Sequence, residues 1–323
     1  MKVDFINYLG KRLITLIPTL LAISIVIFFI LALAPGDPLS EFATNPNLTA
    51  EVRENIRKSL GLDQPIYIRY IKWLIAFCQG NLGYSFASRS PVSDLIWQRL
   101  PNSLMVVGVA YLLSVIISLP LGVISAVKRY SLVDNLATTI AFFGYSIPPF
   151  FTGLLLIIIF SVQLKWLPFI YDGNLEINSW QEFILQVKQS LMPIMVLSLY
   201  QTAILMRFMR SSVSEELNQE YVKTAYSKGL SKFQVVFKHV LRNALIPVIT
   251  LIALDIPSLF TGALVTEQIF RIPGIGSLLI ESIYRSDTPV VMAITMIYGI
   301  LIVFFNLIAD LTYSWLDPRV RLQ

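Results

Sequence analysis

Six long apolar runs constrain this chain more than any other feature of its sequence. They cover residues 13–34, 104–127, 136–162, 190–206, 244–266 and 288–309. A helix needs about 20 mostly apolar residues to cross the hydrocarbon core of a bilayer, and a helix satisfies its own backbone hydrogen bonds there. Asp255, in the fifth run, is the only acidic or basic residue within them. The sequence therefore predicts an all-α membrane protein with six transmembrane helices.

The distribution of basic residues predicts the orientation of these helices. The net charge of +5 could indicate a nucleic-acid ligand, but in membrane chains Lys and Arg gather mainly in cytoplasmic loops. With the N-terminus inside, the inner segments carry most of the basic residues. The two short outer loops carry only Lys165, Lys188, Arg271 and Arg285. We expect both termini inside and no nucleic-acid partner.

The long segment between the first two runs is expected to be helical on the outer face. Thr49 can cap a first helix, Pro65 can open a second, and Ser90 with Pro91 can begin a third. We expect residues 1–95 to form the first transmembrane helix with this outer segment, and residues 96–323 to form a core with five transmembrane helices. Cys78 is the single cysteine, so no intrachain disulfide can form.

Residues 218–247 form the longest stretch that is both charged and strongly patterned. They predict two short helices in tandem. Asn218 is the expected N-cap of the first, and Gly229 is suited to the left-handed residue that ends it. Ser231 and Gln234 have capping-box spacing, and Leu230 with Val235 has the spacing of a hydrophobic staple.

The second of these two helices is predicted to be amphipathic. Its apolar residues recur at helical spacing and are expected to share one face; they are Phe233, Val236, Phe237, Val240 and Leu241. The opposite face is expected to be basic, with Lys232, Lys238, His239 and Arg242. Basic loops beside a membrane can bind anionic lipid, but the ordered caps indicate a docked protein partner.

Two features within the apolar runs are candidates for a transport pathway. Ser146, Pro148 and Pro149 lie in the third run, where the prolines predict a kink. This kink could face a pathway or could only help helices to pack. Asp255 is costly at membrane depth unless it is paired or hydrated, so it is either functional or a hydrogen-bond acceptor for a neighbouring helix.

No catalytic or cofactor site is predicted in this chain. Lys11 follows Gly10, but Phe5 and Arg12 replace the first Gly and the final Ser or Thr of a phosphate-binding P-loop. One His and one Cys cannot build the usual zinc sites. We expect no catalysis, no bound cofactor and no bound metal in this chain.

The stretch EYVKTAYSKGLSKFQVVFKHVLRNALIPV closely resembles the EAA loop of inner-membrane permease subunits of binding-protein-dependent ABC importers, and the dipeptide and oligopeptide branch fits best. Further matches extend over nearly the whole chain in the family's order. They are LAPGDP, LGLDQPIYIRYIKWL, GNLGYSF, RLPNSL, YSIPPFFTGLLLI, EQIFRIPGIGSLL and LDPRVRL. Lys223, Thr224 and Ala225 occupy the Glu-Ala-Ala positions, so only the second Ala and Gly229 match there. Ser286 stands where the family usually has Arg.

The resemblance implies a type I (MetI-like) permease fold in a prokaryotic plasma membrane, with the EAA loop at residues 211–247. We call residues 218–247 the coupling segment, because the resemblance implies that it contacts an ATPase. Its expected contact residues are Glu220, Tyr221, Lys223, Thr224, Ala225, Lys228, Gly229, Leu230 and Ser231.

The resemblance also implies the partners of this chain. A homologous second permease, two ABC ATPase subunits that bind ATP and Mg²⁺, and an extracytoplasmic solute-binding protein are expected, and di- and oligopeptides are the first expected substrates. Nickel chelates, glutathione and sugars stay open as alternatives. An ion-coupled secondary transporter using Asp255 is the alternative from another class, but it would not need a capped cytoplasmic helix pair.

Overall fold

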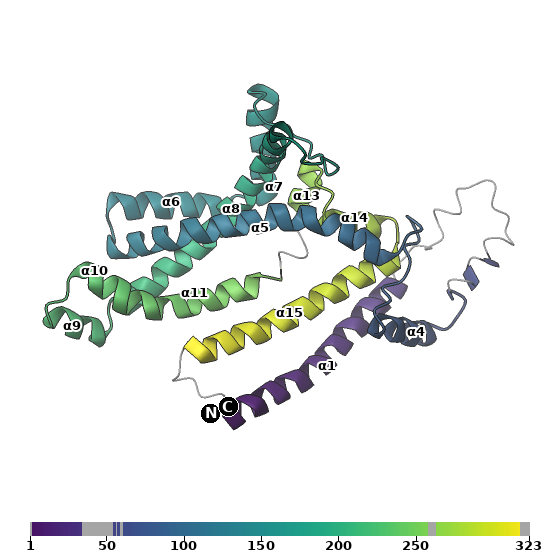
Figure 1. Ribbon diagram of the computed structural model, residues 1–323, viewed down its shortest axis with the longest axis horizontal. Helices are drawn as coiled ribbons and strands as arrows, with labels where there is room; N and C mark the ends of the chain where they lie inside the picture. The colour runs from purple at the N-terminus through teal and green to yellow at the C-terminus, as the bar shows by residue number, and fades with distance from the viewer. Residues whose placement is uncertain (1, 34–53, 56, 59–60, 258–262, 317–323) are drawn as a thin grey trace. The chain divides into compact units, whose positions relative to one another are not determined.

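The computed structural model describes residues 2–33, 54–55, 57–58, 61–257 and 263–316, and these are helical almost throughout (Figure 1). The described part of the chain has no strand beyond an isolated bridge between Tyr84 and Pro91. The expected all-α class is confirmed. The longer helices are α1 (Lys2–Leu33), α4 (Ile66–Cys78), α5 (Val92–Val127), α6 (Leu132–Ser146), α8 (Trp180–Glu216), α11 (Leu241–Asp255), α14 (Ile275–Tyr284) and α15 (Thr288–Leu316). The shorter ones are α7 (Pro149–Leu156), α9 (Glu220–Ser227), α10 (Lys232–Gln234) and α13 (Leu264–Phe270), with π-helical η1 (Ile157–Gln163) and η2 (Val235–Val240).

Five helical segments among the described residues are long and apolar enough to cross a membrane, and a bent pair can supply a sixth. The bent pair is Leu132–Ser146 with Pro149–Gln163, at an angle of 99°. Its bend lies at the predicted prolines but is far sharper than a kink. Ile147 is extended because the residue before a proline avoids the helical region, and Pro149 then opens a new helix.

Two expected helix boundaries were wrong. The fifth span runs from Lys232 to Asp255 rather than over 244–266, so Asp255 lies at its end and not near its middle. The predicted second short helix of the coupling segment is the start of this span, because neither Arg242 nor Asn243, which separate the two predicted elements, is a helix breaker. The predicted third outer helix likewise continues into the second span as α5, through Pro101. Prolines are tolerated in such helices where neighbours satisfy the freed carbonyl groups.

The chain divides into two compact units. The first contains Met1–Pro101 and Gly274–Phe304. Here α1 packs on α4. The Phe28 ring contacts the Tyr70 ring edge-on and is tilted against the Trp73 ring. The hydroxyl oxygens of Ser24 and Tyr70 are hydrogen-bonded, 2.8 Å apart. The expected helix after Pro65 is thus confirmed as α4, whereas the one expected from Thr49 lies largely outside the described residues.

A buried carboxylate organises the outer loop of the first unit. Asp287 is 2% exposed and accepts hydrogen bonds from the Ser85 hydroxyl and from the backbone N–H groups of Phe86 and Ala87, the last two at 3.0 and 3.3 Å. These donors lie in and directly after the GNLGYSF stretch. A buried carboxylate needs such donors, so this loop is fixed to the start of α15.

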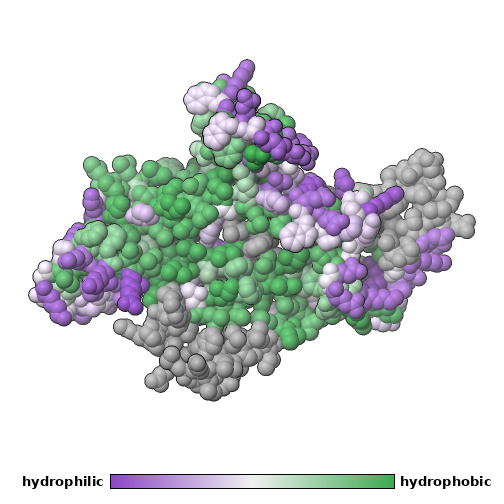
Figure 2. Space-filling model, viewed as in Figure 1, coloured by the Kyte–Doolittle hydropathy of each residue, from purple (hydrophilic) through white to green (hydrophobic). Residues whose placement is uncertain are grey.

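The second unit contains Asn102–Pro273 and Phe305–Gln323. Helices α6 and α11 both pack against α8. Gly122 allows α5 to approach α8 closely, since a Cβ atom there would lie 2.6 Å from Cβ of Met209. Hydrophobic residues cover the exposed sides of α5 and α6, whereas hydrophilic residues gather at the end formed by α9 and α10 (Figure 2).

Cys78 offers a direct test of the expected orientation. It is exposed at the end of α4 and is the only cysteine of the chain. If both termini are inside, a membrane-impermeant maleimide added to spheroplasts should label wild-type protein without permeabilisation. A Cys78→Ser variant that carries Lys228→Cys should be labelled only after permeabilisation. The reverse pattern would show that the orientation is inverted.

Candidate functional site

The coupling segment begins directly after α8, which ends at Glu216. Gln219, not the expected Asn218, is the N-cap of α9. The side-chain amide of Asn218 instead donates to the Ser214 carbonyl at 2.8 Å, in the last turn of α8. The Asn218 side chain therefore satisfies a carbonyl group in the last turn of α8 and does not cap α9. The turn between α8 and α9 is short, so the two helices are directly linked.

Gly229 ends α9 as predicted. Its φ of 78° is left-handed, a conformation that glycine adopts without a steric penalty. The N–H of Gly229 donates to the Tyr226 carbonyl at 2.9 Å, and that of Leu230 donates to the Ala225 carbonyl at 3.4 Å. These two bonds make up a Schellman motif, which satisfies carbonyls that the helix end would leave open.

The start of the next helix, α10, is also fixed as predicted. The Ser231 hydroxyl accepts from the Gln234 backbone N–H, and the Gln234 side chain accepts from the Ser231 N–H at 3.1 Å. Leu230 and Val235 belong to the same apolar cluster, as a hydrophobic staple requires. Opposed caps on both sides of Gly229 leave little freedom in the turn between α9 and α10.

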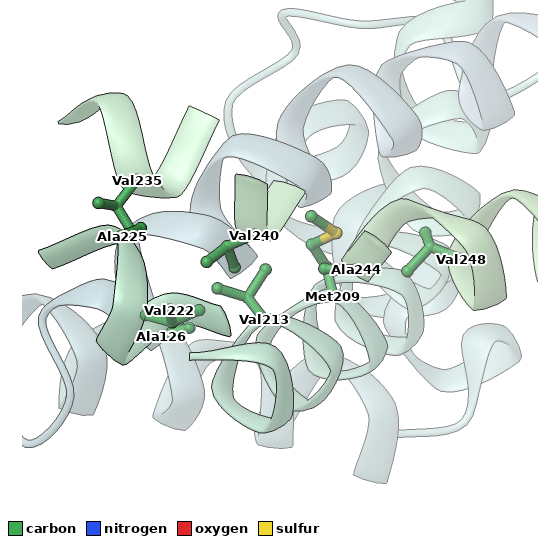
Figure 3. Close-up of a cluster of buried hydrophobic side chains, with 9 residues drawn as sticks. All are labelled: Ala126, Met209, Val213, Val222, Ala225, Val235, Val240, Ala244 and Val248. Carbon is green, nitrogen blue, oxygen red and sulfur yellow. The ribbon is translucent and has the colours of Figure 1, made fainter. Parts of the chain in front are cut away.

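The apolar side of α9 packs against its own chain. Val222 and Ala225 are buried, and they lie in one cluster with Val213 of α8 and Val235 and Val240 of η2 (Figure 3). The cluster also contains Ala126, Met209, Ala244 and Val248. For a segment that faces water, burying one valine side chain contributes about 1.5–3 kcal/mol. We infer that α9, the end of α8 and the start of the fifth span form one packed body.

A polar contact reinforces this body. The Tyr221 hydroxyl donates to the Glu216 carboxylate at 2.6 Å. Burial, followed by this hydrogen bond to Glu216, raises the pKa of Tyr221 to about 12. The tyrosine therefore stays protonated at physiological pH and keeps its donor role.

The opposite side of α9 is exposed and polar. Glu220, Lys223, Thr224 and Lys228 lie there, with an ion pair of 2.7 Å between Lys223 and Glu220. Such an exposed pair contributes little to stability. These side chains are therefore available to a partner surface, whereas Ala225 is buried and Tyr221 and Leu230 are partly buried.

The predicted single apolar face of the second helix was wrong. Val235, Val236 and Val240 are buried, but Phe233 and Phe237 are 68% and 53% exposed and stack on each other with ring centroids 4.4 Å apart. The π-helical turn of η2 changes the angular spacing between these residues, so the valines and phenylalanines separate onto two faces. The phenylalanine pair adds an aromatic surface to the exposed side of the coupling segment.

The structure separates the pathway candidates. Ser146 ends α6, and together with Pro148 and Pro149 it marks the sharp bend before α7. Ser146 also lines a cavity of about 300 Å³ between α6 and α8. Asp255 does not line this cavity; it accepts a hydrogen bond of 2.7 Å from the Gln201 side chain of α8. This contact is of the structural kind foreseen for Asp255, although the donor is an amide and not a hydroxyl.

The sequence did not indicate the bidentate ion pair between Asp134 and Arg210. Asp134 accepts two hydrogen bonds from Arg210, at 2.7 and 2.9 Å, and its side chain is only 2% exposed. Ser131 caps α6, so the spacing of Ser131 and Asp134 carries a recognisable capping signal. Nothing local indicates the partner, because Arg210 lies 76 residues further along the chain.

The described residues contain no group of three or more His, Cys, Asp or Glu side chains that could hold a metal ion. The described helices and the coupling segment are the features of a membrane transport subunit. Comparison with known proteins assigns this subunit to a family.

Residues 118–322 match the family described as binding-protein-dependent transport system inner membrane component, and residues 5–107 match the N-terminal family of the same systems. The chain belongs to this family, and is thus an inner-membrane, multi-pass permease of an ABC importer. It is 42% identical to the oligopeptide transport system permease protein AppB of Bacillus subtilis (strain 168), over 97% of this chain and 99% of the relative. It is 38% identical to the glutathione transport system permease protein GsiC of Escherichia coli (strain K12), over 98% and 99%. Membership of a binding-protein-dependent system implies an ATPase and a solute-binding protein as partners.

Proposed function

We propose that this permease forms half of the translocation pathway of an ATP-driven importer for dipeptides or oligopeptides. The other half comes from a homologous second permease. Two ATPase subunits bind ATP and Mg²⁺ and dock on the inner face of the permease pair, where the coupling segment contacts them, and an external binding protein delivers the peptide. Peptides are favoured because one of the compared relatives is named for oligopeptide transport and another for glutathione, which is itself a tripeptide.

The packing of the coupling segment is the observation that carries the proposed coupling. Helix α9 is closed by a Schellman motif, followed by a capping box, and packed on α8 and η2 through one buried cluster. A force on its exposed polar side would therefore move α8 and the fifth span together. Closure of an ATPase dimer could then bias an outward-facing state, and hydrolysis could reset it.

The test is uptake by the assembled transporter. The permease should be co-expressed with its neighbouring transporter subunits, purified as a complex and reconstituted in liposomes with the binding protein outside. ATP inside the liposomes should drive uptake of a labelled di- or oligopeptide, and a protonophore should leave this uptake unchanged. A panel of peptides, glutathione and a nickel chelate would identify the substrate class.

Three outcomes would each contradict one part of the proposal. Uptake without ATP that stops with the protonophore would favour an ion-coupled transporter, which nothing in the described residues or in the comparisons supports. ATP-driven uptake of a nickel chelate but of no peptide would refute the substrate class and leave the importer mechanism intact. Purification of the chain without any ATPase would refute the partner assignment.

A further inference from the structure

The cavity between α6 and α8 combines apolar walls with a positive charge. Its volume is about 300 Å³, at the lower end of small-molecule sites. Phe142, Ala203 and Met206 contribute apolar surface, and Tyr145, Ser146 and Arg207 contribute polar groups. All of these residues belong to the second unit.

The two arginines at this cavity differ in their contacts. Arg210 is held by Asp134, as described above, and its charge is compensated. Arg207 is exposed, and no carboxylate of the described residues lies within 4.0 Å of its side chain. Its guanidinium lies over the Tyr145 ring, 5.0 Å from the centroid, and this ring stacks on Tyr200 with centroids 5.8 Å apart.

This stacking orders Arg207 without using its hydrogen-bond donors. A cation–π contact uses the positive charge of the guanidinium and none of its five N–H donors. Arg207 lies one residue beyond the apolar run 190–206 of α8, toward the coupling segment. A guanidinium at this end of the run can reach the polar boundary of the bilayer, where an anionic group can approach it.

We propose that this cavity binds a carboxylate or phosphate carried on an apolar body, with Arg207 as the anion-binding residue. The planar donor edge of Arg207 matches the two oxygens of such a group. Tyr145 acts as a positioning residue through the stacking contact, and the apolar wall formed by Phe142, Ala203 and Met206 receives the apolar part of the ligand. The Ser146 hydroxyl, at the end of α6, provides a further donor.

Two sources can supply this chemistry. One is the terminal carboxylate of a peptide in transit, an assignment that rests on the proposed function. The other is the phosphate of an anionic membrane lipid, which does not. The experiment therefore uses the assembled transporter and has one arm for each source.

The variants are Arg207→Gln, which removes the charge, and Arg207→Lys, which keeps the charge but loses the planar donor edge. Arg129→Gln is the matched control, since Arg129 also lies over a tyrosine ring, that of Tyr130 at 4.8 Å, but does not line the cavity. Gel filtration of each complex shows whether it is assembled. The peptide arm measures KM for uptake of one peptide and of its C-terminal amide. The lipid arm titrates phosphatidylglycerol or phosphatidylcholine into the detergent-purified complex and counts bound lipid by native mass spectrometry.

If the ligand is the peptide, Arg207→Gln should raise KM for the free-acid peptide about tenfold and leave KM for the amide unchanged, as expected for loss of one charge-assisted contact. If the ligand is a lipid, the same variant should lose bound phosphatidylglycerol and keep the ratio of the two KM values. In either case Arg207→Lys should fall between wild type and Arg207→Gln.

The proposal is overturned if Arg207→Gln changes neither KM for the free-acid peptide nor the amount of bound phosphatidylglycerol. It is also overturned if Arg129→Gln changes these quantities as much as Arg207→Gln does. Absence of ATP-driven uptake by the wild-type assembly would refute the proposed function instead. The lipid-binding measurement would then still show whether Arg207 binds an anionic lipid at the cavity, since it requires no transport.

Discussion

Replacing Asp134 by alanine is expected to destabilise the second unit by about 3–5 kcal/mol, the usual cost of removing one partner from a buried ion pair. Asp134 accepts two hydrogen bonds from Arg210, one from the Tyr130 N–H at 2.9 Å and one from the Thr138 hydroxyl at 3.2 Å. The variant leaves the Arg210 charge without its acceptor. It also frees the turn at Tyr130, where φ is 65°, a conformation that a non-glycine residue adopts only when held.

Thermal unfolding of the detergent-purified complex, followed by gel filtration after heating, would measure this effect. Glu220→Ala is a matched stability control, because its ion pair with Lys223 is equally short but exposed; it should cost no more than about 1 kcal/mol. The double variant Asp134→Leu with Arg210→Met should recover much of the loss, since apolar residues can replace a buried pair. Unchanged unfolding of Asp134→Ala would show that this ion pair does not hold α6 on α8.

Replacing Gly229 by valine is expected to uncouple transport from ATP hydrolysis while the protein still inserts. No atom lies within 4 Å of the position that a Cβ at Gly229 would take, so the effect comes from backbone conformation and not from a clash. A left-handed β-branched residue costs about 1–2 kcal/mol, which shifts an equilibrium by about 5- to 30-fold. The turn would leave its φ of 78° and separate the Schellman motif from the capping box.

The measurement is the ratio of peptide uptake to ATP hydrolysis in proteoliposomes, which should fall by a similar factor. Gly229→Asn should stay close to wild type, because asparagine tolerates the left-handed region. Gly80→Val is a matched control for strain elsewhere: Gly80 has a φ of 80° and also has no atom within 4 Å of its Cβ position. Equal uncoupling in Gly80→Val, or full coupling in Gly229→Val, would refute the special role of the turn.

Much of the fold and of the coupling segment could be predicted because the determining interactions are local. Apolar length predicts a spanning helix, a proline pair predicts a break, and a glycine flanked by caps predicts a left-handed turn. The break at Pro148 and Pro149, the turn at Gly229 and the capping box of Ser231 were all in their predicted places. Asn218 was the exception, because its amide had a competing acceptor in the preceding helix.

Interactions between distant helices could not be predicted in the same way. The pairing of Asp134 with Arg210, and of Asp255 with Gln201, joins residues 76 and 54 positions apart. The sequence gives the chemistry of each side chain, but it does not show which side chain from another helix will contact it. The exposure of Phe233 and Phe237 was missed for a related reason, since a uniform helical period places them with the valines and the π-helical turn does not.

Local sequence patterns alone predict that this chain crosses a membrane, that a helix breaks at Pro148 and Pro149, and that a capped turn at Gly229 follows a short charged helix. These depend on backbone chemistry within a few residues. The folded chain is needed to show which side of α9 is buried and which arginine of α8 is paired with a carboxylate. Both depend on packing between helices: the cluster around Val235 covers one side of α9, and Asp134 neutralises Arg210 but not Arg207.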